Sequence, residues 1–333
     1  MCLYEKTIEN RRYKANKKNG GVIPAIFDER ERYVTVGCGR CMECMKKKSN
    51  NWRVRLLEEL KDKNTENARF ITLTFNTESI IEFSKLREIN RRDGYERDNK
   101  MCKIAIRRFL ERWRKKYKKS VRHWFVTEIG GGRYEHIHIH GILFTNKSNS
   151  VIEEIWNYGY IHHNDYCNEK TINYIIKYLH KTDEKHKEYE PVVLCSQGIG
   201  KRFIERNKHR YKYNGEDTKE IYKDNKGIIT NLPDYYKKKL FSDEERIRLW
   251  MKKLDKKIKY INGIKIDMSK GDETYWKILE DERKKNIILG YNKGDKDIIK
   301  RINENIERNN LYERRIREYS YVIPEKEIEE NIS

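Results

Sequence analysis

The sequence predicts an α+β protein in which helices pack against a mainly antiparallel sheet. Short runs rich in β-branched and aromatic residues, which favour strands, recur between residues 70 and 195. Between several of these runs, apolar residues repeat every three or four positions, as on the buried face of a helix. Gly130, Gly131 and Gly132 form a turn between two strand-like runs that follow each other directly.

The expected elements follow one another in the order strand, helix, strand, strand, helix, strand, helix, strand. A short amphipathic helix over 49–60 precedes them. The expected strands cover residues 70–75, 124–129, 135–144, 160–162 and 192–195. The expected helices between them cover residues 103–118, 151–156 and 171–181. This order fits an α+β layer fold related to the ferredoxin-like or RRM-like plan.

The composition favours a polyanionic partner. The chain carries 74 Lys and Arg against 53 Asp and Glu, a formal net charge of +21, and each phosphate that such cations contact releases condensed counterions. The 23 tyrosines add rings on which bases can stack. The alternative is that the lysines reflect A/T-rich coding and only solvate the surface. The absence of an apolar run of about 20 residues and of an apolar N-terminal segment argues against membrane and secreted proteins.

Three regions are expected along the 333 residues. They are a Cys-rich N-terminal segment over 1–62, an α+β core over 63–205, and a basic, largely helical C-terminal region over 206–333. The last region is rich in Lys, Asn and Glu, with helical stretches such as 243–259. We expect it to be either a helical accessory domain or a partly disordered arm that contacts DNA.

Three histidines alternate with isoleucines in the strand expected over 135–144. Because successive side chains point to opposite faces of a strand, His136, His138 and His140 share one face. Two imidazoles at positions i and i+2 can converge on one metal ion. The alternative interpretation is a polar face on an edge strand.

Glu128, on the preceding strand, is expected to join these histidines. If residues 130–134 form the connection, Glu128 pairs with His136 and Val126 with His138, and Glu128 lies diagonal to His138 on the same face. A slip of one residue would turn Glu128 away. We therefore predict a metal site of Glu128, His138 and His140, with His136 as an accessory candidate. Its open positions suit Mg²⁺ or Mn²⁺ acting as a Lewis acid on a phosphate oxygen.

Two tyrosines spaced by four form a second candidate group. On a helix, Tyr174 and Tyr178 project from one face, and Lys177 and Lys181 share the same spacing. A phenolate can attack a phosphodiester polarised by metal, and a neighbouring Lys can lower the phenol pKa or stabilise the leaving oxygen. The alternative is a structural helix with half-buried tyrosines. Two tyrosines would allow two successive transesterifications.

Cys38, Cys41 and Cys44 offer three closely spaced thiols, whereas a structural zinc site needs four ligands. Cys2 is the candidate for the fourth. An iron–sulfur cluster is an alternative, but no second electron-transfer feature accompanies the cysteines. Free thiols in a reducing cytosol are the other alternative.

Together these motifs resemble the three motifs of rolling-circle initiators in the HUH (His-hydrophobic-His) endonuclease superfamily, and most of all the gokushovirus-type replication initiation proteins of microviruses. The likeness extends over about residues 1–240, and nothing is recognised after them. The residues that carry it are Phe70-Ile71-Thr72-Leu73-Thr74-Phe75, His138-Ile139-His140 after Glu128, Tyr174 with Lys177, Tyr178 and Lys181, Cys38-Gly39-Arg40-Cys41 with Cys44, Ser196-Gln197-Gly198-Ile199-Gly200-Lys201, and Leu232-Pro233-Asp234-Tyr235-Tyr236.

The resemblance implies that residues 63–205 form an HUH endonuclease core, with the metal-binding pair on His138 and His140 and the paired catalytic tyrosines on Tyr174 and Tyr178. Relatives more often carry an Arg where His136 stands. The implied activity is nicking of single-stranded or supercoiled origin DNA through a 5′-phosphotyrosine that leaves a free 3′ hydroxyl, followed by rejoining of the displaced strand into circles. Implied partners are the host polymerase and helicase, in the cytoplasm of the bacterial host.

Two rival functions stay open. A plasmid or transposon HUH nickase shares the chemistry, although the microvirus-like cysteine and Ser-x-Gly-x-Gly motifs disfavour it. A non-catalytic, zinc-stabilised single-stranded DNA-binding protein explains the charge and the aromatic residues but not the histidine face. We find no Gly-x₄-Gly-Lys-Ser/Thr loop, so none of the steps is expected to use a nucleoside triphosphate.

Overall fold

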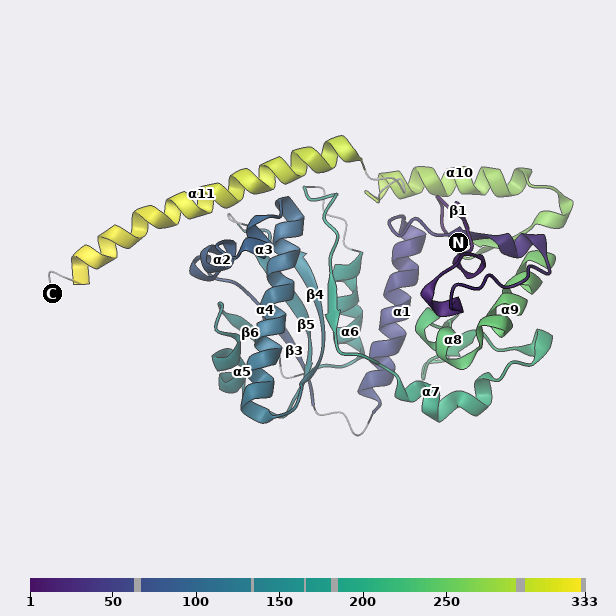
Figure 1. Cartoon of the computed structure of the whole chain (residues 1–333), viewed down its shortest axis with the longest axis horizontal. Coiled ribbons are helices and arrows are strands. Elements are labelled where there is room, and N and C mark those ends of the chain that lie inside the picture. Colours follow the sequence, from purple (N-terminus) through teal and green to yellow (C-terminus); the bar gives the residue numbers. More distant parts are fainter. Residues whose placement is uncertain (63–66, 133–134, 165, 181–184, 292–296, 331–333) are drawn as a thin grey trace. The chain divides into compact units, whose positions relative to one another are not determined.

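The computed structural model describes residues 1–62, 67–132, 135–164, 166–180, 185–291 and 297–330 (Figure 1). The chain divides into two compact units. One comprises Met1–Arg55, Thr182–Lys187 and Gly200–Lys296, and the other Leu56–Lys181, Glu188–Ile199 and Asp297–Ser333. Segments distant in sequence therefore belong to one unit. The three regions 1–62, 63–205 and 206–333 stay a prediction about domain limits.

The unit that contains the histidine motif, here called the sheet unit, is built on five antiparallel strands in the order β6-β3-β5-β4-β7. The strands are β3 (Ala68–Leu73), β4 (Arg122–Ile129), β5 (Ile137–Phe144), β6 (Ile161–Asn164) and β7 (Val193–Cys195). The predicted α+β class, with a mainly antiparallel sheet and a helical C-terminal region, is confirmed.

Helices cover both faces of this sheet. They are α2 (Thr77–Ser84), α3 (Arg87–Asn90), α4 (Gly94–Tyr117), α5 (Asn149–Trp156), α6 (Glu169–Ile176) and α11 (Ile298–Glu330). Figure 1 shows α4 on one side of the sheet and α6 on the other. Phe109 of α4 packs in one core with Ile137 and Ile139 of β5. Since side chains alternate along a strand, His138 and His140 face the opposite side, toward α6.

Several element limits differ from the sequence-based expectation. Helix α4 begins at Gly94 rather than at 103, and the two short helices before it were not expected. Helix α6 ends at Ile176, and a 3₁₀ turn over Lys177–Leu179 continues it. These differences lie at element ends, where the apolar periodicity fades and capping decides the boundary.

The predicted register between β4 and β5 is wrong by two residues. Glu128 pairs with His138 and Val126 with His140, rather than with His136 and His138. The connection is wider than expected, because the Gly130 N–H donates to the His136 carbonyl and keeps His136 outside β5. A shift of two residues preserves the face on which every side chain lies, so Glu128 remains beside the histidines.

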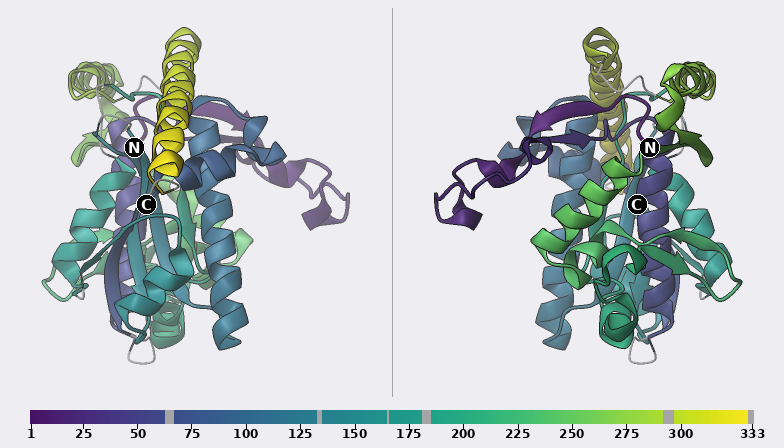
Figure 2. Two further views of the ribbon diagram at one scale, coloured as in Figure 1. Left: turned by 90° about the vertical axis from the view of Figure 1, so that its left-hand side faces the viewer. Right: turned by 90° about the vertical axis from the view of Figure 1, so that its right-hand side faces the viewer.

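The other unit, here called the cysteine unit, combines the N-terminal segment with most of the C-terminal region. Its elements are β1 (Lys6–Glu9), β2 (Tyr33–Val36), α1 (Met42–Leu60, whose last residues belong to the sheet unit), α7 (Arg202–Asn207), β8 (Ile221–Lys223), β9 (Ile229–Asn231), α8 (Asp234–Leu240), α9 (Asp243–Asp255), β10 (Ile258–Ile261), β11 (Ile264–Asp267) and α10 (Glu273–Ile288). The residues between β1 and β2 form an extended arm (purple in Figure 2).

The C-terminal region thus contains hairpins as well as helices. The helix expected over 243–259 ends at Asp255, because the chain turns at Lys257, which has a φ of +49°, into the β10–β11 hairpin. In the cysteine unit, Leu3 and Met42 are buried against Ile261 and Leu279. The N-terminal cysteine segment and the C-terminal hairpin therefore share one hydrophobic core. Among the described helices, none has a stretch long and apolar enough to cross a lipid bilayer.

Candidate functional site

Glu128, His138 and His140 meet on the α6 side of the sheet. One ligand atom from each lies within 4.8 Å of the others. His140 Nε2 is 2.7 Å from Glu128 Oε2, and the two side chains are only 9% and 16% exposed. Burial lowers the pKa of His138, and the nearby His140 contributes to the shift. An imidazole kept neutral presents a lone pair, so this set of two nitrogens and one carboxylate fits a divalent metal ion.

Thr72 orients one of these ligands, and sequence reasoning did not single it out. Its Oγ1 lies 2.9 Å from His140 Nδ1, and Thr72 pairs with His140 across the β3–β5 ladder. A ligating imidazole bonded through its second nitrogen is held in one tautomer and orientation. The signal was present in the Phe-Ile-Thr-Leu-Thr-Phe strand, but reading it required the strand pairing.

The two tyrosines come together beside the metal-binding candidates. The Tyr178 ring stacks on the His140 ring, with centroids 4.1 Å apart and planes 6° from parallel. The Tyr178 hydroxyl donates to the Tyr174 hydroxyl over 2.7 Å, and Tyr174 is 49% exposed. Tyr174 also meets the edge of Phe70, a second neighbour that sequence reasoning did not assign. Both hydroxyls therefore lie where a phosphate bound at the histidines is within reach.

The proton on Tyr178 is held firmly. Burial raises the pKa of this phenol above its usual value, and the hydrogen bond to Tyr174 and the negative charge of Glu128 raise it further. A phenol in that environment stays protonated at neutral pH. Positive charge at the site would reverse the effect, because an adjacent cation favours the phenolate.

The other predicted residues are placed differently. Lys177 is exposed at the start of the 3₁₀ turn, and Lys181 lies outside the described residues. His136 is not a member of the metal-binding group. Its Nδ1 lies 3.1 Å from the Phe75 carbonyl oxygen, and burial lowers the pKa of His136 to about 4. A neutral His136 therefore ties the start of β5 to the end of the β3 segment.

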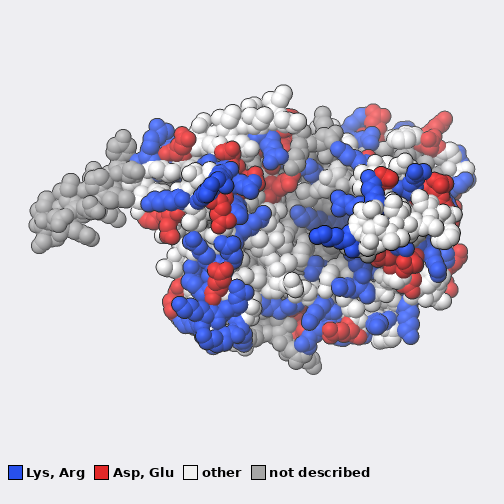
Figure 3. Space-filling model, viewed as in Figure 1, with Lys and Arg blue, Asp and Glu red and all other residues white. Residues whose placement is uncertain are grey.

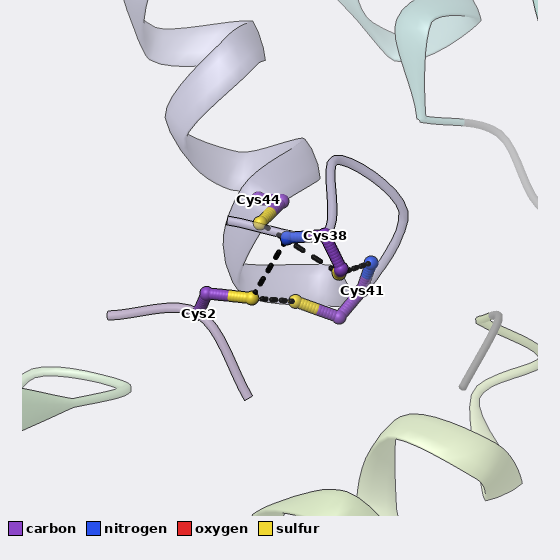
Figure 4. Close-up of side chains that lie close together, drawn as sticks. All are labelled: Cys2, Cys38, Cys41 and Cys44. Carbon is purple, nitrogen blue, oxygen red and sulfur yellow. Dashed lines mark hydrogen bonds between the residues drawn. The ribbon is translucent and has the colours of Figure 1, made fainter. Parts of the chain in front are cut away.

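In the cysteine unit, the four cysteines form a second metal-binding candidate (Figure 4). The sulfurs of Cys2, Cys38, Cys41 and Cys44 lie within 4.8 Å of one another. The Cys2 and Cys41 sulfurs are 3.8 Å apart, and those of Cys38 and Cys44 are 3.9 Å apart. All four cysteines are free rather than disulfide-bonded. Four converging thiols are the donor set of a structural zinc site.

Backbone N–H groups complete the surroundings of these sulfurs. The N–H groups of Tyr4 and Cys38 donate to the Cys2 sulfur, and those of Arg40 and Cys41 donate to the Cys38 sulfur. Such bonds stabilise thiolates, which are the ligating form. Burial nevertheless raises the pKa of Cys2 to about 11, so metal binding must displace protons from the group.

Comparison with known proteins adds one finding. Residues 68–183 match the model of a family of replication-associated proteins of the ORF2 type. The matched segment runs from the first residue of β3 past α6, so it includes Glu128, His138, His140 and both tyrosines. Neither the curated proteins nor the solved structures include a match to this chain. The match supports a rolling-circle replication initiator, which implies DNA binding.

Proposed function

We propose that this protein is an HUH-type nicking and joining enzyme that starts rolling-circle replication, of the kind used by microviruses of the gokushovirus type. The observation that carries the proposal is the convergence of Glu128, His138 and His140 with Tyr178, whose ring stacks on His140. A site that only bound single strands would need aromatic rings and cations, but not this acidic and imidazole cluster. The family match over residues 68–183 supports the same function.

The residues of the site divide the reaction among them. Glu128, His138 and His140 would hold Mg²⁺ or Mn²⁺, which when bound supplies Lewis-acid polarisation of the scissile phosphate. Tyr174 or Tyr178 gives up its phenolic proton and forms a bond to phosphorus, while the bond from phosphorus to the 3′ oxygen breaks. The released 3′ oxygen takes up a proton and becomes the primer end. The 5′ phosphate stays on the tyrosine.

The second tyrosine then allows the reaction to end as it began. Because the two hydroxyls are 2.7 Å apart, either one is close enough to attack when the origin has been regenerated. The new 3′ hydroxyl displaces the first tyrosine from its phosphate and closes the displaced strand into a circle. Lys177 and Lys181 are proposed to stabilise the phenolate and the leaving oxygen.

The rest of the chain is proposed to serve DNA binding and stability. Lys and Arg lie between acidic residues over much of the visible surface (Figure 3), and the net charge of +21 favours a nucleic-acid partner. Zn²⁺ bound by Cys2, Cys38, Cys41 and Cys44 would tie the N-terminal strand to α1. The host polymerase and helicase would extend the primer end, in the cytoplasm of the bacterial host.

The test is a nicking reaction with Mn²⁺ and a supercoiled plasmid that carries the origin of the source genome. The expected result is an open circle and a DNA-linked peptide that contains Tyr174 or Tyr178, identified by mass spectrometry. His140→Ala should bind the same DNA without nicking it, since the charge of the protein is unchanged. A wild-type protein that retards the plasmid and leaves it closed would be a binding protein, and the proposal would be wrong.

A further inference from the structure

Helix α11 packs on the sheet unit through polar side chains. Glu304, Arg308 and Arg315 are 6%, 5% and 3% exposed, whereas Ile298 and Ile302, near the start of the helix, are 70% and 52% exposed. This is the reverse of an ordinary amphipathic helix. Buried ion pairs add little net stability, because the charges must be desolvated, but they tolerate only one geometry. The contacts of α11 are therefore suited to holding a neighbour in a defined position.

Arg308 is the residue that reaches toward the histidine motif. Its Nε donates to Asp98 Oδ2 of α4 over 2.7 Å. Its Nη2 donates to the backbone carbonyl of Glu135 over 2.8 Å, and its Nη1 to Glu135 Oε2 over 3.3 Å. A guanidinium offers several donors in a rigid plane, so one side chain joins α11, α4 and the residue two positions before β5.

Glu135 needs such support. Its φ is +47°, in the left-handed region that residues other than glycine rarely adopt, and its N–H donates to the Gly132 carbonyl. Strained conformations of this kind persist only where the surroundings hold them. Glu135 lies three positions before His138, and Gly130 leaves no room there, since a Cβ on it would meet His138 Cε1 at 2.9 Å. A relaxed Glu135 would therefore displace a proposed metal ligand.

We infer that Arg308 is a positioning residue for the metal site: through Glu135 it holds the chain that enters β5, and with it the imidazole of His138. The inference rests on the proposed function, because it concerns the same ligands. It also assigns a role to a C-terminal helix that lies beyond every recognised motif. Outer groups that orient metal ligands typically affect metal affinity by about 10- to 100-fold.

The test compares Mn²⁺ binding by two full-length variants, without DNA, from the electron paramagnetic resonance signal of free Mn²⁺. Arg308→Lys keeps the buried charge but loses the planar fork, and we expect its dissociation constant for Mn²⁺ to rise about tenfold. Arg314→Lys, the same change at an exposed position on α11, should bind like wild type. Measurements well below each thermal midpoint separate ligand positioning from a loss of folding.

The outcomes distinguish the two levels of the argument. Wild-type affinity in folded Arg308→Lys would overturn the inference and leave the proposed function intact. A wild-type protein that binds no Mn²⁺ would overturn both. If Arg308→Lys does not fold, Asp98→Asn, which loosens the same guanidinium and keeps the side-chain volume, is measured in the same way. Weakened Mn²⁺ binding then supports the inference, and unchanged binding refutes it.

Discussion

Replacing Thr72 by Val should weaken metal binding while leaving the fold in place. Val keeps the branched shape of this buried strand residue but removes the hydroxyl that lies 2.9 Å from His140 Nδ1. Without that partner, the imidazole has less reason to keep its Nδ1 protonated and its Nε2 lone pair directed toward Glu128. Loss of such an orienting bond costs about 10- to 100-fold in metal affinity, which is about 1.4–2.8 kcal/mol. Folding stability should change by only about 1 kcal/mol.

The assay is Mn²⁺ titration of Thr72→Val, Thr72→Ser and wild type, combined with single-turnover cleavage of an origin oligonucleotide. Thr72→Ser keeps the hydroxyl and should retain wild-type affinity. Cleavage by Thr72→Val should recover at high Mn²⁺ concentration, because the nucleophile and the DNA-binding surface are unchanged. If Thr72→Val binds Mn²⁺ as tightly as wild type, the hydroxyl does not orient His140 and the reasoning is refuted.

Three further predictions address the nucleophiles, the cysteine group and the core. Tyr174→Phe and Tyr178→Phe should each still cleave a single-stranded origin oligonucleotide once, because either hydroxyl is near the ligands, and the double variant should not; a single variant that is inactive in the first cleavage would show that only one tyrosine attacks. Cys41→Ser should remove bound zinc, measured by elemental analysis, and lower the thermal midpoint; folded wild type without zinc would contradict the assignment. Phe109→Ala, at a fully buried position, should cost about 3–5 kcal/mol in denaturant unfolding, and a loss below about 1 kcal/mol would show that α4 does not carry the core.

Much of the site could be predicted because strand periodicity is a local property. The alternation of His138 and His140 with isoleucines places both imidazoles on one face in any register. The position of Glu128 survived a register error for the same reason, since the error was of two residues. The roles of these side chains and of the tyrosines remain predictions until the reactions are measured.

What the sequence by itself determined was the α+β class, the polar face of the histidine strand and the spacing that brings Tyr174 and Tyr178 together. These follow from periods of 2 and about 3.6 residues, which are written into neighbouring positions. Only the tertiary structure decided that Thr72 bonds to His140, that Cys2 joins Cys41, and that Arg308 supports Glu135. Such contacts join residues far apart in sequence, and the packing that brings them together depends on the whole unit rather than on any local pattern.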